Sequence, residues 1–213
     1  MSLKELLSGY GGQAFPFPSI AGKYKDRKLG LVVCGDAACV WDDLEKFGCR
    51  SDAPPFGKVW KDGWHFMTVN KLVETFPGVI EHCYSNQGHL LEKFIAARRL
   101  EYKREFSGPH HTHSCLSGSA NRWPWGGHGT SALGATVVGL ALGYEHIVLC
   151  GVPLDDGHHN GEPHWRRCHI GSNETAGSVT DDRDSHWKRA IQSGFDGKVK
   201  SMSGRTKVWL GAP

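Results

Sequence analysis

Short apolar runs alternate with helical repeats from Lys28 onward. The run KLGLVVCGDAA ends in a glycine and an acid, and ACVWDDLEKFG after it has helical spacing. Two further apolar runs, GWHFMTVNKLV and GVIEHCYSN, reach polar residues at Asn70 and Asn86. This part of the chain therefore predicts a strand, a turn and a helix, followed by two more strands.

The later half repeats the alternation. HLLEKFIAARRLEYKRE has apolar residues on a helical repeat with interleaved charges, which indicates a surface helix. After a predicted loop over FSGPHHTHSCLSGSANRWPWGGHG come a helix from Thr130 to Leu142, closed by Gly143, and a strand from His146 to Cys150. SHWKRAIQSGF predicts a helix, GKVKSMS a strand and GRTKVWLG a short helix. Such alternation predicts an α/β fold with a Rossmann-like open parallel sheet and helices on both faces.

The domain organisation follows from the same pattern. Residues 1–27, rich in Gly, Pro and aromatics, predict an irregular N-terminal arm, and residues 28–213 predict a single domain. Residues 156–183 form a long His-rich stretch without periodicity. Because an ordered domain rarely carries so long a loop without a use for it, we expect a lid or binding loop there.

Composition narrows the classes of partner. The 25 Lys+Arg and 22 Asp+Glu leave a net charge of +3, which does not indicate nucleic acid or an anionic membrane. With neither an apolar run long enough to span a bilayer nor a signal-peptide core, the chain is expected to be cytoplasmic. Its seven cysteines are expected to be reduced thiols, mostly buried as small hydrophobes.

Polar residues end the predicted strands. Ligands of open α/β sheets bind beyond the carboxyl ends of the strands, where this sequence brings Gly35, Asp36, Asn70, Asn86 and Asp155. The turn at Gly35 could hold a phosphate on backbone N–H groups, or be a simple tight turn. In GHGTSALGA, Thr130 or Ser131 can cap a helix whose small residues permit either close ligand approach or tight helix–sheet packing.

Three segments together resemble a known group of proteins. VVCGDAACVWDDLEKF, FMTVN and SALGATVVGLALGYEHIVLCGVPLD are similar to the Rossmann-like group of bacterial sialyltransferases of the Campylobacter type and 6-hydroxymethylpterin diphosphokinase-like domains. The resemblance covers roughly Lys28 to Gly151. It implies a nucleotide at the strand ends, with Gly35 near phosphate and Asn70 and Asn86 near sugar or phosphate. It further implies Ser131 near the base or phosphate, Asp155 near the ribose or reaction centre, and His186 as general base.

Histidines and arginines supply further candidates. His111, His113, His158 and His159 are candidate metal ligands, with Zn²⁺ the ion that imidazole and thiolate ligands suit, although the spacing fits no standard finger. Arg166 and Arg167 could close over a diphosphate. The Asp-rich segments could hold Mg²⁺.

The resulting hypothesis is a transferase that uses a nucleotide-activated donor, most simply a nucleotide-sugar glycosyltransferase acting on a hydroxyl acceptor. Its alternatives are a Mg²⁺-dependent diphosphokinase-like phosphoryl transfer, a non-catalytic nucleotide-binding module and a zinc-stabilised interaction protein.

Overall fold

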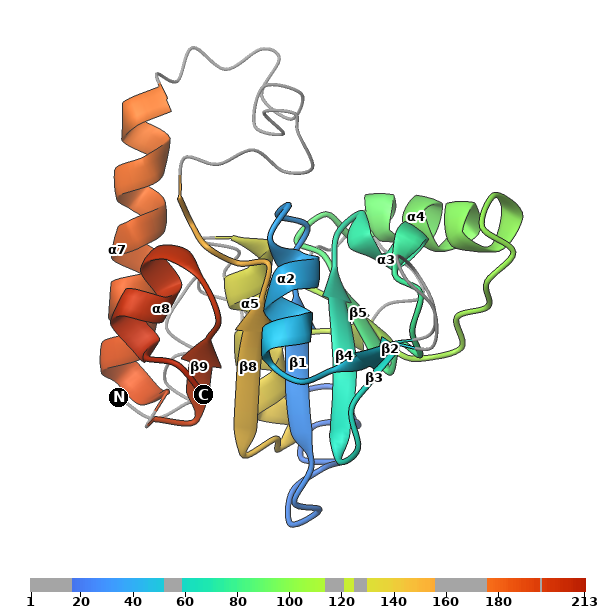
Figure 1. Cartoon of the computed structure of the whole chain (residues 1–213), viewed down its shortest axis with the longest axis horizontal. Coiled ribbons are helices and arrows are strands. Elements are labelled where there is room, and N and C mark those ends of the chain that lie inside the picture. The colour runs from blue at the N-terminus through green and yellow to red at the C-terminus, as the bar shows by residue number, and fades with distance from the viewer. Residues whose placement is uncertain (1–16, 52–58, 114–120, 125–129, 156–175, 196) are drawn as a thin grey trace.

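The computed structural model describes residues 17–51, 59–113, 121–124, 130–155, 176–195 and 197–213. Within them, seven parallel strands form one sheet in the order β7-β6-β5-β4-β1-β8-β9, with helices on both faces (Figure 1). The strands are β1 (Gly30–Cys34), β4 (Trp64–Val69), β5 (His82–Tyr84), β6 (His110–Thr112), β7 (Asn121–Arg122), β8 (His146–Cys150) and β9 (Val199–Ser201). The predicted α/β open parallel sheet is confirmed.

The central strands are apolar throughout because both of their faces are covered. In β1, Leu31 and Val33 join one hydrophobic cluster, while Val32 and Cys34 point to a second cluster on the opposite face. β8 pairs in register with β1 and alternates in the same way. The apolar runs that form β1 and β8 are thus strands buried on both faces of the sheet.

The helices divide between the two faces. α2 (Val40–Lys46), α3 (Leu72–Thr75) and α4 (Gly88–Leu100) pack on one face, and α5 (Ser131–Leu142) and α7 (Ala176–Gly194) on the other, with α8 (Gly204–Leu210) beside β9 (Figure 1). In α5, a Cβ on Gly134 would overlap the Tyr84 hydroxyl. A Cβ on Gly139 would come within 2.6 Å of a Leu31 methyl. The small residues of this helix therefore serve close packing on the sheet.

Several predicted boundaries hold and others shift. α5 has Thr130 as its N-cap and a left-handed Gly143 as its C-cap, and β8 spans the predicted residues. The predicted loop after α4 contains two short strands, β6 and β7. Helix α7 begins at Ala176, so the last eight residues of the expected lid loop are helical. Residues 156–175 of that loop and residues 1–16 of the arm lie outside the described residues.

Other elements were not apparent in the sequence pattern. β2 (Arg50–Ser51) and β3 (Val59–Trp60) pair antiparallel as a small separate sheet, and the four-residue α3 follows β4 directly. Five cysteines lie in the described part of the chain, all as free thiols. No helix in that part combines the length and apolar character needed to cross a bilayer.

Candidate functional site

Two glycines meet where the strand order reverses, between β1 and β8. Gly35 follows β1 and Gly151 follows β8. The Gly35 N–H donates to the Cys150 carbonyl oxygen at 2.8 Å, and a Cβ on either glycine would collide with the carbonyl oxygen of the other. The Gly35 N–H is therefore already bonded within the chain. The absence of a side chain at both glycines allows the two loops to touch.

Asp36 comes next in this turn and is partly exposed. Burial raises the pKa of Glu74 on α3, and the negative charges of Glu101 and Asp36 raise it further, while Lys71 lowers it. The charges of Asp36 and Glu74 therefore repel each other.

A second group of polar residues links the ends of β4 and β5 to the start of α5. Asn70 has a left-handed backbone (φ 54°), which is uncommon for a non-glycine residue. The Ser85 hydroxyl donates to Asn70 Oδ1 at 2.9 Å and accepts from the Gln87 N–H at 3.0 Å. The Asn86 N–H donates to the Ser131 hydroxyl at 3.3 Å. These hydrogen bonds, with the peptide bond between Ser85 and Asn86, connect three predicted site residues: Asn70, Asn86 and Ser131.

Thr130 has a defined hydrogen-bonding role at the start of α5. Its hydroxyl oxygen accepts from the Leu133 N–H at 3.2 Å, as an N-cap, and from the Trp187 indole N–H at 3.1 Å. A hydroxyl has two acceptor positions and one donor. Because both acceptor positions are filled, the Thr130 hydroxyl can only donate to any further partner.

His186 reaches this region through α7. It is mostly buried, with 8% of its surface exposed, and it directly precedes Trp187, which is fully buried. The Trp187 indole binds Thr130, so this part of α7 packs against the start of α5. His186 is the preceding residue on the same helix, and its role as general base stays a prediction.

Asp155 serves the start of α8. Its carboxylate is exposed and accepts from the Arg205 backbone N–H at 3.2 Å. The Arg205 guanidinium forms an ion pair with Asp184 of α7 at 2.8 Å. These acids tie together the loop after β8, α7 and α8. In this arrangement Asp155 and Asp184 each have a partner within the chain. Asp155 follows β8, and β1 lies between β8 and the strands β4 and β5, which Asn70 and Asn86 follow.

Asp43 is a buried acid that the sequence analysis did not single out. Only 2% of it is exposed, and its Oδ2 accepts from the Gly151 N–H at 2.8 Å and the Ser203 hydroxyl at 2.6 Å. It therefore fixes the loop after β8 and the residue before α8. A signal was present, because Asp43 occupies the position between Val40 and Leu44 on the buried stripe of α2, where an apolar residue is normal.

The candidate metal ligands are only partly described. Both ring nitrogens of His111 are hydrogen-bonded, Nε2 with His82 at 3.0 Å and Nδ1 with the Trp123 indole at 3.1 Å, and its role as a metal ligand stays a prediction. His113 Nδ1 lies 3.1 Å from the Tyr84 hydroxyl. His158, His159, Arg166 and Arg167 lie outside the described residues. Among those described, no three His, Cys, Asp or Glu residues are grouped as a metal site.

The protein is therefore an open α/β protein in which several polar residues gather at the carboxyl ends of β4 and β5. No model of a known protein family matches the chain, and no curated protein matches its sequence significantly. One solved structure that it resembles is the sialyltransferase CstII from Campylobacter jejuni in complex with a substrate analogue, cytidine-5'-monophosphate. The match has 10% sequence identity and a TM-score of 0.49, covering 86% of this chain and 84% of that chain. So distant a likeness transfers neither a substrate nor a residue role, and the topology itself defines the fold.

Proposed function

We propose that the chain binds a nucleotide-activated donor at the carboxyl edge of β4 and β5 and transfers its activated group, most simply a sugar, to a hydroxyl acceptor. The observation that carries the proposal is the Thr130 hydroxyl, which can only donate to a further partner and lies at the first turn of a twelve-residue helix. Backbone N–H groups of a first helical turn and a hydroxyl that donates together suit a phosphate.

The neighbouring residues supply complementary groups. Asn70 carries a side-chain amide, and Ser131 a hydroxyl, within the hydrogen-bonded group that joins β4, β5 and α5. Such amide and hydroxyl groups suit the hydroxyls of a ribose or sugar. The strained backbone of Asn70 is consistent with a functional position, because such conformations concentrate at binding sites.

His186 is the proposed general base. Its imidazole would take the proton from the acceptor hydroxyl as the acceptor oxygen bonds to the donor carbon. The bond between that carbon and the phosphate oxygen breaks, and the electron pair leaves with the nucleotide. The developing negative charge on the phosphate would be met by the Thr130 hydroxyl and the start of α5.

Binding is tested first by thermal unfolding with a panel of nucleoside mono- and diphosphates, including CMP because the structural neighbour contains it. A ligand at a hundredfold its dissociation constant adds about 2.7 kcal/mol, which raises Tm by about 5–10 °C for a chain of this size. Thr130→Val should weaken that binding about tenfold or more, and Thr130→Ser should retain it. Each variant is compared with its own ligand-free Tm, because the valine also removes the N-cap.

Turnover is tested separately, by release of nucleotide from nucleotide sugars with a panel of hydroxyl acceptors. His186→Ala should abolish release while leaving nucleotide affinity within a few-fold of wild type. Equal turnover in His186→Ala would refute its role as base. Tight binding with no product from any donor would show a nucleotide-binding module without catalysis, and no stabilisation by any nucleotide would refute the proposal as a whole.

A further inference from the structure

Five polar side chains form a continuous hydrogen-bonded chain on the α5 face of the sheet. The Trp123 indole N–H donates to His111 Nδ1 at 3.1 Å, and His111 Nε2 lies 3.0 Å from His82 Nδ1. His82 Nε2 lies 2.9 Å from the Tyr144 hydroxyl, which lies 2.7 Å from His65 Nδ1. The chain crosses β6, β5 and β4 in turn.

The direction of the first three bonds in this chain is fixed by its first member. An indole N–H can only donate, so His111 Nδ1 must be the acceptor and the single proton of the neutral ring is on Nε2. That N–H donates to His82 Nδ1, which places the His82 proton on Nε2 as well, and the His82 N–H donates to the Tyr144 oxygen. His111 and His82 are therefore Nε2–H tautomers. The bond between Tyr144 and His65 can run in either direction, because a hydroxyl that accepts from His82 can still donate to His65 or accept from it.

The surroundings keep these rings neutral. Burial lowers the pKa of His82 to about 3 and lowers those of His111 and His65. The other contributions act in the same direction and come from Lys23 and Arg27 of the arm and from neighbouring imidazoles, including His110. The remaining titratable neighbours are two tyrosines and an acid: Tyr24 packs on His65, His82 and Tyr144, and Glu81 acts on Tyr144.

The arm is attached at the half-exposed end of the chain. Tyr24 stacks on Tyr144 with ring centroids 4.6 Å apart and meets the rings of His65 and His82 edge-on at 5.2 and 5.5 Å. The N–H groups of Gly22 and Tyr24 donate to the carbonyls of Ala141 and Leu142 at 2.9 and 2.8 Å. The described arm, residues 17–27, thus rests on His82, whose tautomer the indole fixes, and on Tyr144 and His65 at the end of the chain.

We propose that Trp123, His111, His82, Tyr144 and His65 form an acid-opened latch that holds residues 17–27 against the amino-terminal edge of the sheet. A proton on His82 or His111 sets two N–H donors face to face. These two rings cannot reverse to relieve the conflict, because the indole cannot accept a hydrogen bond.

The sign of the pH dependence follows from the lowered pKa values. A histidine whose folded pKa lies below its unfolded value of about 6.5 stabilises the closed state fully above that pH. The stabilisation is lost as the pH falls from about 6.5 toward the folded pKa. For one imidazole that stays neutral when closed, lowering the pH from 7.5 to 5 increases opening about thirtyfold.

The tautomers are tested by long-range proton–nitrogen NMR of the full chain at pH 7.5. We expect Nε2–H at His82 and His111. Trp123→Phe should relax the first two bonds and give mixed tautomers at His111 and His82, whereas Trp187→Phe removes a different buried indole bond and should leave both unchanged. An Nδ1–H tautomer at either histidine in the wild type overturns the proposal, as does an unaltered pair in Trp123→Phe.

Opening is tested by hydrogen exchange of the Gly22 and Tyr24 amides, corrected for intrinsic rates, at pH 7.5 and pH 5. Their protection should fall about thirtyfold while that of Ile147, which binds the Lys198 carbonyl between β8 and β9, changes less than about twofold. Equal protection at both pH values overturns the proposal. A parallel loss at Ile147 also overturns it, because the whole domain and not the latch would then be opening.

Discussion

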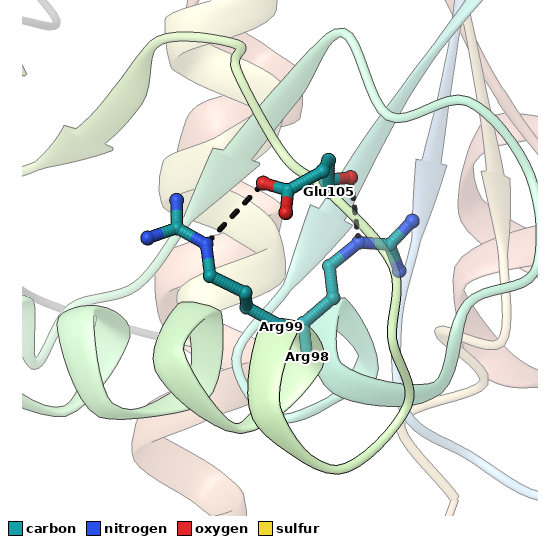
Figure 2. A network of polar contacts seen from close by, with 3 residues as sticks. All are labelled: Arg98, Arg99 and Glu105. Carbon is teal, nitrogen blue, oxygen red and sulfur yellow. Dashed lines mark hydrogen bonds and ion pairs between the residues drawn. The ribbon is translucent and has the colours of Figure 1, made fainter.

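Arg98 offers the sharpest test of how the described fold is held together. Its guanidinium is 3% exposed and donates to backbone carbonyls only: Val73 at 2.9 Å, Phe76 at 2.7 Å, Gly78 at 3.3 Å and, through Nε, Glu105 at 3.2 Å. Figure 2 shows Glu105 between two arginines, with its backbone toward Arg98 and its carboxylate toward Arg99. Arg98 therefore joins α4 to the end of α3 and the loop beyond it.

Arg98→Met keeps much of the apolar stem and removes these four bonds. Burial lowers the pKa of Arg98 to about 10, so the side chain is still charged at neutral pH. Three buried bonds and one part-buried bond from a charged donor, at about 1 kcal/mol each, give a loss of about 4 kcal/mol in the free energy of unfolding. That loss corresponds to a Tm lower by about 8–16 °C. The free energy is measured by urea unfolding monitored by circular dichroism.

Arg99→Met is the matched control on the same helix turn. The Arg99 side chain is 60% exposed and the Glu105 side chain 77%, at a separation of 3.2 Å. An exposed ion pair of this kind contributes between 0 and about 1 kcal/mol. If Arg98→Met cost no more than Arg99→Met, the inference that carbonyl capping by the buried guanidinium holds α3 and α4 together would be refuted.

Two further predictions concern packing and thiol reactivity. Gly134→Ala should lower the free energy of unfolding by about 1–3 kcal/mol, because the new Cβ would overlap the buried Tyr84 hydroxyl. Alanine favours helix more than glycine does, so a variant that is more stable in urea would contradict this packing. Burial raises the pKa of the Cys34 and Cys150 thiols well above the ordinary value, so both should stay unmodified by iodoacetamide at pH 8 in the native protein and react after unfolding. Peptide mass spectrometry distinguishes the two states, and labelling of either cysteine in the folded chain would contradict its burial.

The elements that the sequence predicted well carry strong local signals. α5 has a capping threonine, a run of small and apolar residues and a terminal glycine, and β1 and β8 are apolar runs bounded by turn residues. Such signals lie within a few residues of one another and need no knowledge of distant contacts. The end of β4 at Asn70 was predictable for the same reason.

The missed elements depend on distant contacts. β6 and β7 are only three and two residues long, and their polar sequences carry no strand pattern. They are strands because β6 pairs with β5 and β7 pairs with β6. Arg98 was interpreted as part of a charged surface, because its carbonyl acceptors are distributed over α3 and two loops. Periodicity cannot identify a buried cation whose partners are backbone atoms.

The candidate site, like the fold, could be predicted only in part from the sequence. The sequence predicted the polar residues at the strand ends, but their grouping depends on which strands are neighbours. β1 lies between β8, which leads to Asp155, and the strands that lead to Asn70 and Asn86, and Asp43 of α2 binds the Gly151 N–H beside β1. None of these relations could be predicted before the order of β1 and β8 in the sheet was known.

The position of β1 also has a consequence for the order in which the chain can fold during synthesis. Gly30 pairs with Trp64 on one side, soon after it is made, but on the other side with His146, which is made much later. Until then one edge of the most apolar strand has open backbone groups, and such edges recruit other strands. We therefore expect the nascent chain to be most prone to aggregation between the completion of β4 and the arrival of β8.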